Sequence, residues 1–227
     1  DYLSKCLELL ESDRGAVGVC TNYLQFDEEG NNAEYVDVDN EFGMEAGDDR
    51  FREFLRRRWF TGDRADLVIF GLMRWQALVK TDLIRGFIGS DDCLVMELVL
   101  KGRIGQVREN LKYLRDHDGA YHSIKEKHFW REGEAEARWL DPENNGKVYL
   151  PYWRRLREYF AIAVKSDAGI FVKFCMAWWL IYPFGFRWRK RLLSEVIFAV
   201  GLGRFCINIK RSLKGMFAKS SKVRESS

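Results

Sequence analysis

Proline is scarce in this chain, with only 3 among 227 residues, and its 5 cysteines do not pair in the sequence. No two cysteines have CxxC spacing and their number is odd, so the sequence predicts neither a zinc site nor a disulfide framework. Unpaired cysteines of this kind favour a reducing, cytoplasmic compartment. A large excess of either charge is also missing, because 37 Lys and Arg face 34 Asp and Glu. That balance argues against a dedicated nucleic-acid-binding protein.

Several familiar catalytic motifs are absent as well. The sequence contains no P-loop, no GxSxG and no GxGxxG after an expected strand, and it shows no repeat of solenoid period. No basic-then-apolar leader opens it. The first residues already have a helical pattern and no Met precedes them, so we expect a fragment whose beginning is missing.

What the chain does have is enough apolar sequence, 47% of residues, to form a folded core. In the first half, strands alternate with helices, which predicts an α/β layer. We expect strands at 16–26, 65–73 and 107–115, and helices at 2–12, 50–60, 75–80 and 90–101. Turn residues fill 27–32, residues 33–49 form a loop, and Ser90 serves as the N-cap of the last of these helices.

The character of the sequence changes after about residue 128, where long helical patterns take over. We therefore expect two parts: residues 1–128 as an α/β unit and residues 129–227 as a helical C-terminal extension. Residues 153–165 are amphipathic, 170–186 are strongly apolar, and 192–209 form another apolar helix. The run 170–186 is shorter than a bilayer span and contains Lys173, so a buried helix is favoured over membrane contact. A peripheral membrane contact through 170–209 is the alternative.

Three patches could carry chemistry, and each also has a plain structural explanation. Asp91 and Asp92 start a predicted helix, where carboxylates either cap the helix or act as a general base in a cleft. Residues 114–123 combine Arg and His in an apparent loop, which fits either a solvated turn or an anion or metal-diphosphate site. Arg74 follows a strand that contains Gly71 and either faces a substrate or simply ends the strand in solvent. Arginines 56–58 are expected on a solvated face, and tryptophans 178 and 179 in the core.

Five segments occur in an order that resembles the C-terminal half of a glycosyltransferase family 2 domain. One is the Tyr-Leu helix start at 1–3, and another is the hairpin 23–30, similar to the family's D-x-x-G element. Residues 69–78 resemble its G-x-x-R-R-x-A-L strand and helix. Residues 89–102 resemble its D-x-x-L-x-x-x-L-x-x-x-G segment, and 113–123 its Y-R-x-H-x-x-S loop. The resemblance implies a partial GT-A (Rossmann-like) sheet layer followed by the helical extension.

The resemblance also implies an activity, that of an inverting glycosyltransferase in glycan or polysaccharide synthesis. Its partners would be a nucleoside-diphosphate sugar and a hydroxyl acceptor. Asp91 matches the family's catalytic base, and Asp92 is the near alternative. The base takes a proton from the acceptor hydroxyl, whose oxygen displaces the diphosphate at the anomeric carbon.

Four further residues receive roles from the same resemblance. Arg115 and His117 match the diphosphate or metal side of the cleft, and Gly71 and Arg74 match the acceptor side. The cofactor implied is Mg²⁺ or Mn²⁺. The nucleotide-binding half with the family's DxD metal motif is not part of the matched sequence, so the fragment alone is expected to be inactive. The competing hypotheses are a non-catalytic module that docks on a membrane surface or a partner, and a different α/β transferase.

Overall fold

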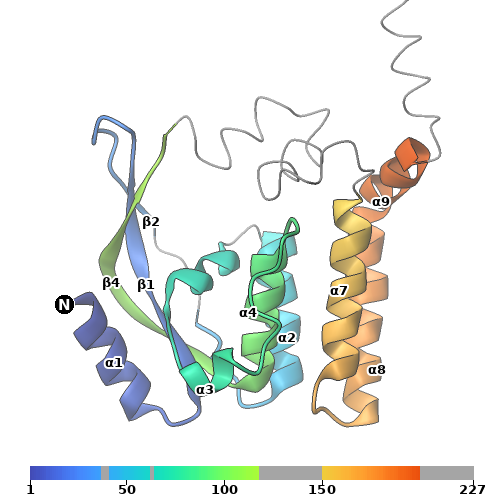
Figure 1. Cartoon of the computed structure of the whole chain (residues 1–227), viewed down its shortest axis with the longest axis horizontal. Coiled ribbons are helices and arrows are strands. Elements are labelled where there is room, and N and C mark those ends of the chain that lie inside the picture. The colour runs from blue at the N-terminus through green and yellow to red at the C-terminus, as the bar shows by residue number, and fades with distance from the viewer. Residues whose placement is uncertain (37–40, 62–63, 118–149, 200–227) are drawn as a thin grey trace, which may run out of the picture.

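A computed structural model describes residues 1–36, 41–61, 64–117 and 150–199 (Figure 1). The elements stack in successive layers. Helix α1 (Tyr2–Ser12) covers one side of the sheet, and α2 (Gly47–Arg56) and α4 (Ser90–Lys101) lie on the other. Beyond them come α7 (Pro151–Lys165) and α8 (Ile170–Trp179). This is the mixed α/β class that the sequence predicts.

The sheet is built around β1 (Ala16–Phe26). Strand β4 (Arg103–Arg115) runs parallel to β1 along its whole length, whereas β2 (Glu34–Val36) and β3 (Leu72–Met73) pair with it in the antiparallel sense. The first eight residues of β1 are all buried, the polar Thr21 and Asn22 among them, because both faces of the strand are covered. The predicted strands at 16–26 and 107–115 are confirmed, the second with an earlier start.

The prediction of a strand at 65–73 is wrong for most of its length. Ala65–Phe70 form a 3₁₀ helix (η2), and only Leu72 and Met73 extend into β3. A short apolar run fits a buried helical turn as well as it fits a buried strand, so periodicity could not separate the two. Gly71 marks the change, because a Cβ built there would lie 2.4 Å from the carbonyl oxygen of Val19.

Two further expectations around α2 and α4 need correction. The loop expected at 33–49 contains β2 and the start of α2, which continues past Arg56 as a π-helical turn, η1 (Arg57–Thr61). The arginines 56–58 do not share a solvated face, because Arg57 is buried and bonded to Glu53. The N-cap of α4 is Gly89 rather than Ser90, since its left-handed backbone (φ 85°) turns the chain into the helix. Helix α3 (Trp75–Leu78) is shorter than predicted.

After α8 the helix continues through a π-helical segment, η5 (Leu180–Gly185), into α9 (Phe186–Ala199). Residues from α4, α7, α8 and η5 contribute to one shared hydrophobic cluster with α2 and β1. The boundary expected at residue 128 and the helix expected to reach 209 lie at least partly outside the described residues. Within the described ranges, no helix combines the length and apolarity needed to cross a bilayer.

The expectation of a buried helix over 170–186 is only half correct. Met176, Leu180 and Phe184 face the core, but Phe171 and Trp178 are exposed to 84% and 62%. The helix therefore has two apolar faces, and the protein covers one of them.

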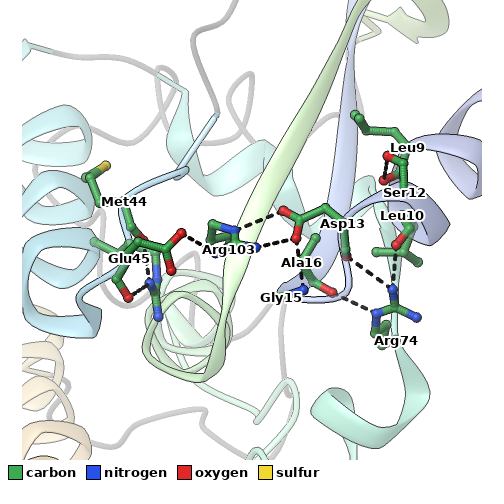
Figure 2. Close-up of polar contacts among 11 residues, drawn as sticks. Leu9, Leu10, Ser12, Asp13, Gly15, Ala16, Met44, Glu45, Arg74 and Arg103 are labelled. Atoms are coloured by element: carbon green, nitrogen blue, oxygen red, sulfur yellow. Dashed lines mark hydrogen bonds and ion pairs between the residues drawn. The ribbon is translucent and has the colours of Figure 1, made fainter.

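Polar contacts fix the end of α1 to the sheet (Figure 2). Arg103, the first residue of β4, donates to both carboxylate oxygens of Asp13 and to Glu45. Arg74 donates to the carbonyl oxygens of Ala16 (2.7 Å) and Leu10, so its guanidinium sits at the carbonyl end of α1. A cation at that end of a helix is favourable. These two arginines join α1, β1 and β4 at one corner of the molecule.

The Asp13 contacts predict an acid-sensitive contribution to stability. Hydrogen bonding to Arg103 lowers the pKa of Asp13 from 3.8 to about 2. Because the folded-state pKa is depressed, this contribution is present above about pH 4 and is lost as the pH falls through about 2. We expect Asp13→Asn to flatten the dependence of unfolding free energy on pH over that window, as measured by urea titrations. Glu8→Gln, on the exposed face of α1, is the control and should keep the parent slope. An unchanged slope in Asp13→Asn would contradict the assignment.

Gly71 gives a second prediction. The Cβ of an alanine at position 71 would meet the carbonyl oxygens of Val19 at 2.4 Å and Val68 at 3.0 Å, so β3 must move away from β1. Gly71→Ala should cost about 1–3 kcal/mol of unfolding free energy, as overpacking usually does. Gly86→Ala is the matched control, because a Cβ there meets nothing within 4 Å. Equal stability of the two variants in chemical denaturation would show that the contact is not restrictive.

Candidate functional site at the start of helix α4

Two neighbouring carboxylates open α4 and have opposite environments. Asp91 is partly exposed, and its Oδ1 accepts a hydrogen bond from the backbone N–H of Asp92 at 2.9 Å. Asp92 has no exposed surface at all. Both positions lie in the first turn, where the helix dipole favours negative charge, as the sequence predicts. The chain reaches this turn through Gly89, where any Cβ would lie 2.2 Å from Nε of Arg155.

Asp92 is held by two arginines from other elements. Its Oδ1 accepts a hydrogen bond from Nε of Arg58 at 2.7 Å, and its Oδ2 lies 3.7 Å from Nε of Arg155. Arg155 belongs to α7 and is 8% exposed, whereas Arg58 belongs to η1. The two guanidinium groups each lie 4.6 Å from the ring centre of Trp59, which adds a cation–π contact to each. Asp92 therefore joins α4, α7 and η1.

The surroundings of this ion pair are apolar and aromatic. The Trp59 indole N–H donates to the buried Tyr159 hydroxyl at 3.3 Å. Burial, followed by the negative charge of Asp92, raises the pKa of Tyr159 well above 10, so the phenol stays neutral. Burial has the largest effect on the pKa of Arg155 and lowers it, but Asp92, Tyr159 and Asp91 together outweigh burial, and the net pKa is raised. The guanidinium of Arg155 thus remains charged inside the protein.

The loop that leads into α4 is fastened to α7 by a second set of contacts. Arg85 Nη1 lies 3.0 Å from a carboxylate oxygen of Glu158. The guanidinium groups of Arg85 and Arg154 lie 4.9 Å and 4.4 Å from the ring centre of the buried Phe87. The start of α4 is therefore a rigid position, and Asp91 is presented from it at the surface.

The structure places Arg115 and His117 at the end of β4, both exposed. The backbone N–H of Asp116 between them donates to the carbonyl oxygen of Phe26, which keeps β4 alongside β1 up to this point. Helix α4 leads directly into β4 and runs in the opposite direction, so the end of α4 lies near the start of β4 and the start of α4 lies partway along the strand (Figure 1). Because β4 extends further than α4, Arg115 and His117 lie toward the tip of the strand pair.

Gly71 and Arg74 are not at that end. Gly71 packs against β1 at Val19, and the backbone N–H of Arg74 donates to the carbonyl oxygen of Val17 at 2.8 Å. The Arg74 side chain is bonded to carbonyl oxygens where α1 ends and β1 begins (Figure 2). The start of β1 pairs with the start of β4 and so lies near the end of α4, whereas Asp91 is at the other end of that helix. The geometry gives Gly71 and Arg74 structural contacts and separates them from Asp91.

A cavity of about 690 Å³ lies near the opposite end of α4, between α3, α7 and α8, with Lys101, Lys165 and Glu97 in its wall. Burial raises the pKa of Glu97. Arg74, which the sequence analysis places on the acceptor side, also lies in the wall of this cavity. Among the residues that the structure describes, no three His, Cys, Asp or Glu side chains converge as metal ligands. His122 and Ser123, from the expected 114–123 loop, lie outside those residues.

Sequence reasoning missed Arg58 and Arg155 as partners of Asp92. Arg155 did leave a signal, because it shares one helix face with Tyr159 and Ile162 at i, i+4 and i+7, and both of those are core residues. A charge on the buried face of a helix indicates a buried partner. For Arg58, the neighbouring arginines 56 and 57 hid any such signal.

No protein-family model, curated protein or solved structure matches this chain.

The two carboxylates should differ sharply in what their substitution does to stability. Asp92→Asn removes the charge that compensates two arginines, one of them buried, and loss of a partner from a buried ion pair typically costs about 3–5 kcal/mol. Asp91→Asn touches a partly exposed side chain and should cost less than about 1 kcal/mol. Urea denaturation followed by circular dichroism measures both. If the two variants lose equal stability, Asp92 does not hold these elements together.

Proposed function

We propose that this chain forms the acceptor-side part of an inverting glycosyltransferase of the GT-A fold. It would transfer a sugar from a nucleoside-diphosphate sugar to an acceptor hydroxyl in glycan or polysaccharide synthesis. The observation that supports this best is the contrast between the two carboxylates of α4. Asp92 is enclosed and ion-paired, whereas Asp91 stands partly exposed on a rigid helix start. A general base needs such a fixed and accessible acceptor.

The order of elements is compatible with the resemblance that suggested this activity. A buried strand, a short antiparallel strand, a helix that begins with two carboxylates and a strand parallel to the first follow one another in the chain. The D-x-x-L-x-x-x-L-x-x-x-G spacing starts at Asp91 and places Leu94 and Leu98 in the core. Asp91 therefore fits the base position better than Asp92, which serves as a positioning residue.

The reaction that follows is a single displacement. Asp91 takes the proton of the acceptor hydroxyl while the hydroxyl oxygen forms a bond to the anomeric carbon. The bond from that carbon to the diphosphate oxygen breaks on the opposite side, so the configuration inverts. Arg115 and His117, at the end of β4, lie further along this strand than the start of α4, so no contact to the leaving diphosphate is proposed for them. No contact to substrate is assigned to Gly71 or Arg74.

The resemblance also implies Mg²⁺ or Mn²⁺, which would stabilise charge on the leaving diphosphate. The described residues do not fit such an ion by themselves, because no three ligand side chains converge among them. His117 belongs to no such group, so no step is derived through a metal here.

Turnover of nucleoside-diphosphate sugars tests the proposal, in a longer polypeptide that includes the donor-binding half implied by the resemblance. Asp91→Asn should lower kcat by about a hundredfold, with little change in KM for the donor, because a general base typically contributes that much. Release of nucleoside diphosphate is the readout.

Asp49→Asn is the matched control, since Asp49 occupies the first turn of α2 as Asp91 does that of α4. It should keep the parent kcat. Full turnover in Asp91→Asn, or an equal loss in both variants, would remove Asp91 from the catalytic role.

A further inference from the structure

The continuous helix from α8 through η5 to α9 carries apolar side chains on two opposite faces. One face, with Met176, Leu180, Phe184 and Leu192, is buried against the rest of the protein. The other stays uncovered over its whole length. A helix that is apolar all round is normally enclosed by protein or lipid, and here protein encloses only half of it.

The uncovered face is a stripe at helical spacing, rich in aromatic rings. Trp178 and Tyr182 stack with ring centres 5.5 Å apart, and Tyr182 and Phe186 follow at 6.5 Å. We call this the exposed stripe; its large apolar members are Ile170, Phe171, Phe174, Trp178, Ile181, Tyr182, Phe186 and Leu193. Each is at least 60% exposed. On an ordinary protein surface, exposed apolar residues are scattered singly rather than gathered in one stripe.

The charges that this helix itself carries between residues 170 and 194 are all positive, whereas Asp48 and Asp49 of α2 line a hollow beside Cys175 and Trp179. Arg189 lies within the stripe, three residues after Phe186 and four before Leu193, and its guanidinium is 4.0 Å from the Phe186 ring centre. Lys190 lies beside it and is exposed. No Asp or Glu occurs between Asp167 and Glu195. Glu195 does not face this surface freely, because it accepts hydrogen bonds from the backbone N–H groups of Tyr152 and Trp153.

The sequence after Ala199 continues the same charge pattern. Residues 200–227 contain seven Lys and Arg and a single acidic residue, Glu225. The net charge of the whole chain is only +3, so the positive charge is concentrated in this C-terminal part. A basic segment next to an apolar helical face is typical of attachment to an anionic lipid surface.

We propose that the exposed stripe docks the protein on an anionic bilayer, with α8 and α9 lying in the interface plane. The aromatic rings enter the headgroup region, where Trp and Tyr are favoured, and Arg189 and Lys190 contact lipid phosphates. An anionic bilayer supplies negative charge to match these cations, and its flat surface suits an apolar stripe that follows one long helix. A protein partner would need acidic groups as well, but it would not require such a stripe. The docking does not depend on the proposed sugar transfer.

Flotation with vesicles tests the docking directly. The chain should float with vesicles of equimolar phosphatidylcholine and phosphatidylglycerol, and much less with phosphatidylcholine alone. Added salt should weaken the binding, because the basic groups contribute through screened charges. Phe174→Ser combined with Trp178→Ser should weaken it by about tenfold or more, since binding follows the buried apolar area. Arg189→Gln with Lys190→Gln should have an effect of similar size.

Matched controls separate this face from general stickiness. Trp75→Ser removes a tryptophan that is 68% exposed on α3, against 62% for Trp178, and should leave binding unchanged. Lys80→Gln with Lys101→Gln is the corresponding charge control, as both lysines are exposed. Circular dichroism of each variant verifies folding. Brominated lipid should also quench the tryptophan fluorescence of the unaltered protein, and Trp178→Phe should reduce that quenching.

Three results would overturn the proposal. The first is failure of the unaltered chain to bind anionic vesicles. The second is binding that stays unchanged when Phe174 and Trp178 are replaced by serine, which would show that it comes from electrostatic attraction of the basic sequence alone. The third is self-association that the stripe variants abolish, measured by light scattering without lipid, which would make the stripe an interface between copies of this chain.

Discussion

The fully enclosed carboxylate of Asp92 holds three parts of the structure together. Arg58 comes to it from the turn after α2, and Arg155 comes from α7. Removing charged groups from water is costly, and the cost is recovered only when opposite charges meet with good geometry. The two guanidinium groups also pack against Trp59, whose indole donates to Tyr159. Without Asp92, the charge of Arg155 on α7 would be buried against the sheet layer without a compensating partner.

This ion pair also shapes the surface above it. Gly89 has to be a glycine because its backbone is left-handed and Arg155 occupies the space of a Cβ. The turn that results leaves Asp91 as the accessible carboxylate next to a buried one. The difference in exposure between Asp91 and Asp92, which supports the proposed catalytic role, is therefore a consequence of packing. The structural role of Asp92 and the proposed catalytic role of Asp91 are compatible. Asp92 stabilises the helix start that presents Asp91 at the surface.

At the other side of the molecule, the constraint is apolar rather than charged. α8 and η5 use one face to complete the core around α2 and α7, and that face is enough to fix the helix. The opposite aromatic face contributes nothing to the core. Its exposure to water is unfavourable. A negatively charged surface that covers this face would account for both the exposed aromatic rings and the neighbouring cations Arg189 and Lys190.

Periodicity and turn chemistry determined much of this structure from the sequence. Residues 16–26 predicted the central strand, the spacing of Leu94 and Leu98 predicted α4, and the first-turn position of Asp91 and Asp92 followed from the same pattern. Local signals fix such elements because they arise from neighbours in the chain. They failed at 65–73, where a 3₁₀ helix and a strand share one apolar pattern.

Only the tertiary structure decided what each candidate side chain does. It enclosed Asp92 with Arg58 and Arg155, 34 and 63 residues away in sequence, turned Arg74 to the end of α1, and left one face of α8 bare. Burial and ion pairing depend on which distant elements meet. For Asp92 the sequence pattern carries no record of that, since a carboxylate at a helix start has the same spacing whether it faces water or an arginine.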